Sequence, residues 1–151
     1  MQHMETDIIS VLKRASSNSC KYPLKLKHAA VLEQIRAAEE RLELALPAEI
    51  FSFYCYSNGA EGEDYIFNIL PVEELQLEND ENGRYIVFSE YLIYSEICGF
   101  MLDIVNSNSF SIVRRIGSTP IDKYNFPVPV CYSLAVYVQI YSREGTFGIW
   151  S

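Results

Sequence analysis

Apolar residues recur every three or four positions through the first sixty residues, which is the spacing of one face of an α-helix. The first such stretch covers about residues 7–15, and Thr6 can act as its N-terminal cap. The pattern predicts a second helix from about His28 to Leu44. The apolar stripe of this second helix consists of Leu32, Ile35, Ala38 and Leu42.

Pro47 separates the second helix from a third, because proline cannot continue a helix but fits the first turn of a new one. Leu46 is a poor capping residue, which indicates that its side chain is there to be buried. The third helix is apolar on nearly all sides, so we expect it to be the most buried segment. Asn58-Gly59 supplies the left-handed residue that ends it.

After Gly59 the pattern changes to short runs that are typical of β-strands. We expect strands at about 65–70, 85–88, 91–96, 99–105 and 110–116. The acidic segments 59–64 and 78–84 are predicted to be loops, as is the proline-containing segment 117–129. Ser133 can cap a closing helix that reaches about Tyr141, and a short strand or tail would follow.

The order of these elements predicts an α+β fold. N-terminal helices and a C-terminal helix would pack on a mainly antiparallel sheet of five to six strands. A length of 151 residues without a linker predicts a single domain over residues 1–151.

Charge is distributed unevenly within the net charge of −8. Residues 1–36 carry a balance of +3, and residues 37–151 carry −11. An acidic body repels phosphate backbones, so we do not expect nucleic-acid binding. The same charge favours encounter with a basic partner, although acidic surfaces also serve solubility.

The chain lacks the signals of membrane insertion and export. No apolar run reaches the roughly 18 residues of a membrane span. The N-terminus has no positive region followed by an apolar block, so we expect a cytoplasmic protein.

Catalytic and metal-binding motifs are missing from the sequence. It contains no G-x-S-x-G, G-x-G-x-x-G, P-loop or H-E-x-x-H pattern, and its two histidines fall within the first 28 residues. The four cysteines, Cys20, Cys55, Cys98 and Cys131, form no C-x-x-C pair, so we expect no zinc site. Cys55 and Cys98 lie in apolar segments and are predicted to be buried. The sequence therefore shows no catalytic constellation, and we expect no cofactor; a small enzyme whose site these motifs do not reveal is the third and least favoured interpretation.

An ordered set of residues in the stretch 35–59 carries a family resemblance. Its members are Ile35, Glu39, Leu46, Pro47, Phe53, Asn58 and Gly59. Later segments continue the pattern at 69–75, 87–93, 99–103 and 133–138. Over about residues 32–141 the chain resembles the SUKH superfamily, which includes Smi/Knr-type cell-wall regulators and many bacterial immunity proteins.

The resemblance implies a non-enzymatic α+β protein that binds and neutralises a bacterial toxin, often a nuclease or deaminase. The alternative that it implies is a regulatory scaffold of the cell-wall regulator type. Binding residues vary within the family, so the candidates here come from charge alone. They are the acids of two predicted loops, Glu61, Glu63, Asp64, Glu78, Asp80 and Glu81, which we expect to form a negative face for a basic toxin surface.

Overall fold

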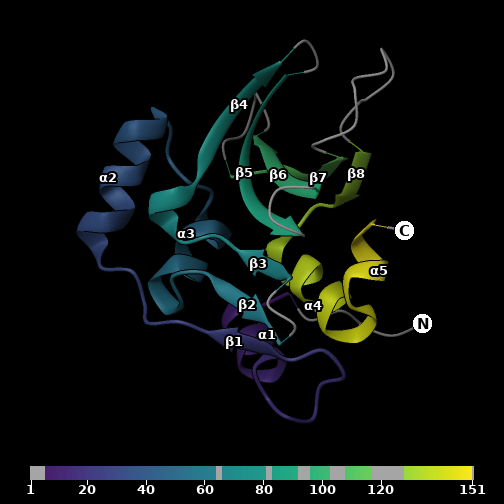
Figure 1. Ribbon diagram of the computed structural model, residues 1–151. Helices are drawn as coiled ribbons and strands as arrows, with labels where there is room; N and C mark the ends of the chain where they lie inside the picture. The colour runs from purple at the N-terminus through teal and green to yellow at the C-terminus, as the bar shows by residue number, and fades with distance from the viewer. Residues whose placement is uncertain are drawn as a thin grey trace.

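A computed structural model describes residues 6–63, 66–80, 83–91, 96–102, 108–116 and 128–150, and it places them in an α+β fold with one antiparallel sheet (Figure 1). The predicted fold class is therefore confirmed. Within this part of the chain, no helix is long and apolar enough to cross a membrane.

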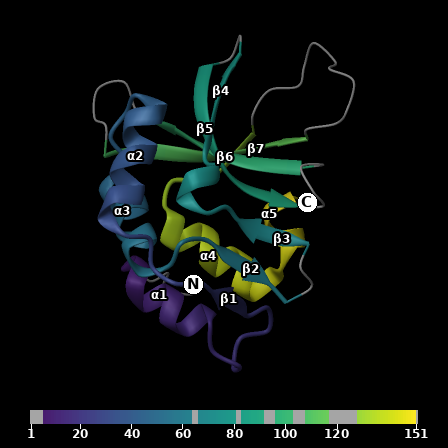
Figure 2. The same ribbon diagram turned by 60° about the vertical axis from the view of Figure 1, so that its left-hand side comes forward.

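The helices flank the strands in sequence, as predicted. They are α1 (Ile8–Ala15), α2 (Leu32–Leu42), α3 (Ala48–Tyr56), the 3₁₀ turn η1 (Val72–Glu74), α4 (Leu134–Glu144) and α5 (Thr146–Trp150). Two views show α1 beside α4, and residues of these two helices are in contact (Figures 1 and 2).

The sheet has more strands than the five or six expected. The described strands are β1 (Leu24–Leu26), β2 (Ala60–Gly62), β3 (Phe67–Ile69), β4 (Gln76–Asp80), β5 (Gly83–Tyr91), β6 (Glu96–Leu102), β7 (Phe110–Ile116) and β8 (Val128–Cys131). Their order is β1-β2-β3-β5-β6-β7-β8, and β4 also pairs with β5. One edge of β5 is shared, because β3 pairs with residues 89–91 and β4 with residues 83–87.

The additional strands come from segments that composition assigned to loops. Residues 60–62 form β2 and residues 76–80 form β4, although acidic residues are uncommon in strands. Ala60 pairs with both Leu26 and Ile69, and it is fully buried. Tertiary pairing thus overrides the local preference of these acidic segments. In the same way, pairing with β7 makes a strand, β8, at the end of the proline-containing segment 117–129 that was predicted to be a loop.

Helix α4, rather than α3, is the most buried helix. Seven of its residues are buried, against three in α3. The Tyr141 ring stacks on Phe67 of β3 at a centroid distance of 4.0 Å, and the Tyr137 ring meets Phe88 of β5 edge-on at 5.2 Å. The Tyr137 hydroxyl donates a 2.8 Å hydrogen bond to Ser89, so the helix is also fixed by a buried polar contact.

The N-terminus of α4 is capped by two side chains, one of which belongs to α3. Ser133 accepts a hydrogen bond from the backbone N–H of Val136, as the sequence predicts. The Glu49 carboxylate accepts from the Ser133 hydroxyl at 2.8 Å and from the backbone N–H groups of Leu134 and Ala135 at 2.5 and 3.2 Å. A negative charge at this position stabilises the helix dipole and joins α3 to α4.

Helix boundaries differ from the predictions where side chains provide local caps. Helix α1 begins after Asp7, whose carboxylate accepts from the Ser10 backbone and hydroxyl, so Thr6 is not the cap. Helix α2 begins only at Leu32, because the Gln34 side chain accepts from the Val31 N–H and fixes Val31 in extended backbone. Leu32 is 56% exposed, so it is not part of the buried stripe.

Two further predictions about apolar segments are wrong. Cys55 is exposed, because it lies on the side of α3 away from buried Ile50 and Phe53. The end of the chain forms α5 rather than a strand or tail, and the backbone carbonyl of Ile149 in this helix accepts a 2.9 Å hydrogen bond from Arg114 of β7.

The signature residues between 35 and 59 have structural roles. Ile35, Leu46, Pro47 and Phe53 are buried. The Glu39 carboxylate accepts from the Leu46 N–H at 2.8 Å, which ties the end of α2 to the connection before α3.

Asn58 and Gly59, which follow α3, contact η1 and the segment that leads into it. Asn58 accepts from the Val72 N–H at 2.7 Å and donates to the Glu73 carboxylate. Gly59 has a φ of 97°, and a Cβ placed there would lie 2.6 Å from the Ile69 carbonyl oxygen. Both the backbone conformation and the close approach require glycine at this position.

Replacing Glu49 tests the connection between α3 and α4. We expect Glu49→Gln to lower the free energy of unfolding by about 1–3 kcal/mol, since an amide replaces a charged acceptor of several hydrogen bonds. Urea unfolding measures the change. The matched control is Glu33→Gln, an exposed acid in the first turn of α2, which should cost less than about 1 kcal/mol. Equal losses in the two variants would contradict the proposed role.

Candidate functional site

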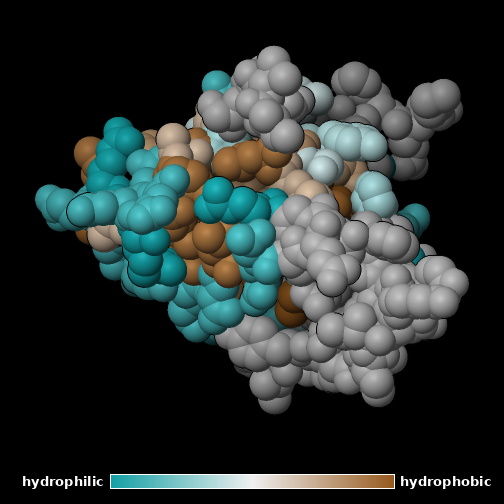
Figure 3. Space-filling model, turned by 90° about the horizontal axis from the view of Figure 1, so that it is seen from above, coloured by the Kyte–Doolittle hydropathy of each residue, from teal (hydrophilic) through white to brown (hydrophobic). Residues whose placement is uncertain are grey.

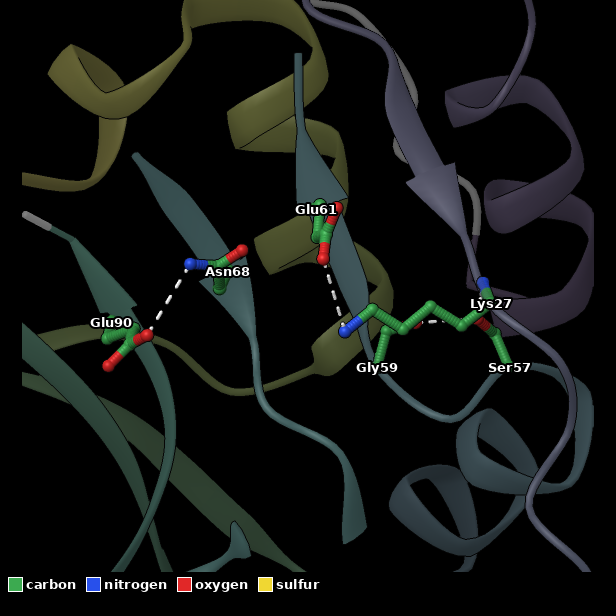
Figure 4. Close-up of polar contacts among 6 residues, drawn as sticks. All are labelled: Lys27, Ser57, Gly59, Glu61, Asn68 and Glu90. Atoms are coloured by element: carbon green, nitrogen blue, oxygen red, sulfur yellow. Dashed lines mark hydrogen bonds and ion pairs between the residues drawn. The ribbon is translucent and has the colours of Figure 1, made fainter. Parts of the chain in front are cut away.

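The sheet has a core face and an outer face. Phe67 and Ile69 of β3 are buried on the core face, so Asn68 between them points to the outer face. Asn68 lies directly opposite Glu61 of β2 and Glu90 of β5. Paired residues of antiparallel strands share a face, so these three side chains form one row across the outer face (Figure 4).

Lys27 completes this row, and we call Lys27, Glu61, Asn68 and Glu90 the polar strip. The Lys27 ammonium lies 3.4 Å from Glu61, and both side chains are about one-third exposed. The Lys27 backbone N–H donates to Ser57, whose hydroxyl donates to the Gly59 carbonyl (Figure 4). The junction after α3 therefore positions the lysine over β2.

A small apolar cluster lies on the same outer face. It consists of Leu70, Tyr85 and Val87, with Ile97 and Met101 packed against them. None of these residues belongs to a described helix. Gly99 lies beneath the Tyr85 ring, where a Cβ would approach the ring to 2.6 Å. The outer face thus combines a packed aromatic centre with an adjacent row of charged groups.

Glu90 is the most unusual group of the polar strip. One of its carboxylate oxygens accepts a 3.4 Å hydrogen bond from Asn68, and the other is buried without a hydrogen-bond partner in the described structure. Burial raises the pKa of the Glu90 carboxyl, the nearby charge of Glu74 raises it further, and the bond from Asn68 partly opposes both effects. The charge of Glu74 in η1 therefore acts on the carboxyl group of Glu90 in β5.

The described members of the six predicted binding acids are separated from one another. Glu61 is paired with Lys27 in the polar strip, Glu63 is exposed in the turn after β2, and Asp64 and Glu81 lie outside the described residues. Glu78 is half-buried on β4 opposite Tyr85, and Asp80 ends that strand.

The strand register explains the separation of these acids. Glu78 aligns with a residue five positions from Glu90 along β5, which corresponds to about 17 Å of extended strand. Glu61 and Glu78 are thus at different ends of the outer face, so these two acids do not form one contiguous patch.

Sequence reasoning missed Lys27, Asn68, Glu74 and Glu90. A signal was present in Ser89-Glu90, two polar residues in succession within a strand. The β5–β6 register shifts between Val87 and Ser89, so that Ser89 faces the core while Glu90 faces outward. Two adjacent polar residues in a strand can mark such a bulge.

The described residues hold no group of three or more His, Cys, Asp or Glu side chains that could bind a metal ion. Cys98 is buried as predicted, and burial raises the pKa of the Cys131 thiol to about 11. Burial likewise raises the pKa of the Tyr54 and Tyr137 hydroxyls. The Cys131 thiol and the Tyr54 and Tyr137 hydroxyls therefore remain protonated at neutral pH. Their roles are in packing and hydrogen bonding.

Comparison with protein-family models, curated proteins and solved structures gave no match to this chain.

The raised pKa of Glu90 predicts a pH-dependent stability. The folded chain binds this proton more readily than the unfolded chain, so the contribution of Glu90 is largest below its ordinary pKa of 4.5. The contribution falls as pH rises through the higher folded-state value. We expect Glu90→Gln to gain stability relative to the wild type between pH 4 and pH 7, measured by urea unfolding. Glu63→Gln, in an exposed turn, should show no comparable gain. Parallel pH profiles for wild type and Glu90→Gln would contradict the assignment.

Proposed function

We infer that this protein is a non-enzymatic immunity protein of SUKH type that binds a cognate toxin and covers its working surface. The resemblance of residues 35–59 to that superfamily supports the class. The observation that carries the proposal is the Glu90 carboxylate on the outer face, one oxygen of which is buried without a hydrogen-bond partner in the described structure. In this proposal the protein acts in the cytoplasm and requires no cofactor.

Charge complementarity identifies the kind of partner. Toxins that act on nucleic acids, such as nucleases and deaminases, need basic surfaces to hold their substrates. A Lys or Arg of such a surface would relieve the repulsion between Glu74 and Glu90. It would also compete with the substrate for the same basic groups. Occlusion therefore follows from binding alone, without any chemical step by this protein.

Apolar surface accompanies the charges, as in many protein interfaces. In the view from above, apolar residues lie beside hydrophilic side chains (Figure 3). A polar rim around an apolar centre is the usual anatomy of a protein–protein interface.

The decisive experiment uses the product of a toxin-like reading frame adjacent to the gene for this protein. We expect the wild-type protein to bind it and to restore growth of cells that express it. The double variant Glu74→Gln/Glu90→Gln should weaken binding at least about tenfold, mainly through loss of charge complementarity. Binding of the wild type should also weaken steeply with added salt.

The control is Glu33→Gln/Glu40→Gln, which removes the same charge from exposed positions on α2. It should leave affinity within about twofold, since its charges lie outside the interface. Equal weakening by both double variants would exclude the Glu74–Glu90 surface. A wild-type protein that neither binds the neighbouring product nor protects cells would overturn the immunity function and favour a regulatory scaffold.

A further inference from the structure

A basic cleft lies between α1 and the end of α4, on a part of the molecule that shares no residue with the polar strip. Its volume is about 760 Å³, within the range of small-molecule sites. The described lining residues are Val11, Arg14, Ala15, Ser19, Cys20, Lys21, Gln139, Ser142, Arg143 and Glu144. Three cations and one carboxylate therefore surround a cavity in a chain with a net charge of −8.

The cleft is formed by segments that are fixed to each other. Cys20 of the connecting loop donates to the Arg14 carbonyl at the end of α1. Two residues later, the Tyr22 N–H donates to the Ser142 carbonyl of α4, and the Tyr22 ring packs against Gly145. The loop is thus bonded to both helices, so the cavity exists before any ligand binds.

Its floor is polar where a close-packed helix contact would be apolar. Gln139 and Ser142 are only 6% and 8% exposed, and each donates to a backbone carbonyl of its own helix. Polar groups at the bottom of a cavity are suited to an occupant that carries hydrogen-bonding groups.

The backbone carbonyls near the ends of the two helices are already satisfied. The Arg14 and Tyr141 carbonyls already accept backbone hydrogen bonds from Ser17 and Gly145, so no cation is needed to satisfy them. Lys21 belongs to neither helix, and its ammonium lies over the Tyr22 ring at 5.6 Å, which holds it beside the cleft.

The geometry points to a binding site for a small phosphate-bearing ligand of about nucleotide size. Two guanidinium groups, Arg14 and Arg143, match the oxygens of a phosphate group bidentately, and Lys21 adds a third positive charge. Screening reduces the field of the distant acidic surface over about 8 Å at physiological salt. The charges that line the cleft are therefore the ones that a ligand there would meet first. Glu144 also lines the cleft, and its side chain lies close to Gly148 of α5.

The test is a titration of the isotope-labelled full-length protein with ADP, followed by NMR and calorimetry. We expect a dissociation constant below about 1 mM at physiological salt, with chemical-shift changes concentrated at residues 14–21 and 139–144. Arg14→Gln/Arg143→Gln should weaken binding at least about tenfold. Glu144→Gln should strengthen it, because it removes the one lining carboxylate.

The matched control is Lys13→Gln/Lys25→Gln, which removes two exposed cations that do not line the cleft. It should change affinity by less than about twofold. Thermal unfolding of each variant establishes that it is folded, and shift mapping on the wild type tests the site without any substitution. Equal weakening in both double variants would overturn the site in favour of overall charge. The proposal is also overturned if ADP does not bind, or if a glutamate-rich peptide occupies the cleft and ADP does not.

Discussion

The Glu49 carboxylate at the start of α4 is the contact on which the arrangement of the helices depends. It comes from the first turn of α3, and it satisfies N–H groups at the first turn of α4. Because α4 carries the Tyr137 and Tyr141 rings onto the sheet, its direction determines how the aromatic core closes. The charged side chain of Glu49, which is distant from α4 in the sequence, thus orients the helix that fills the centre of the molecule.

The cleft beside α1 and the outer face of the sheet differ in the charges that line them. The cations of the first thirty residues gather near α1 and β1, and two of them, Arg14 and Lys21, line a cleft with the end of α4. Glu90 lies on the outer face of the sheet, in one row with Asn68 and Glu61. The net charge of −8 does not predict the electrostatic potential at either surface. A ligand there would interact mainly with the charges within a few ångströms of it. The two surfaces can therefore serve different ligands independently.

Local patterns predicted the elements whose signals are local. Ser133 caps α4, the strand 110–116 is correct at both ends, and Leu46 is buried despite its loop position. The failures have a common cause in long-range pairing, which made strands of acidic segments and separated Glu61 from Glu78. The separation of these acids could not be predicted, because it depends on the register of β5 and on its pairing with both β3 and β4, which no single segment encodes.

The Asn58-Gly59 junction has a consequence for the chemical lifetime of the protein. In an open chain, the glycine nitrogen can attack the asparagine side chain and release ammonia, which leaves an aspartate or isoaspartate. Here Val72 and Glu73 hold the Asn58 side chain, and the Gly59 nitrogen donates to the Ser57 carbonyl. Deamidation requires these contacts to break together. Isoaspartate at this position would therefore accumulate as a record of how often the end of α3 has opened.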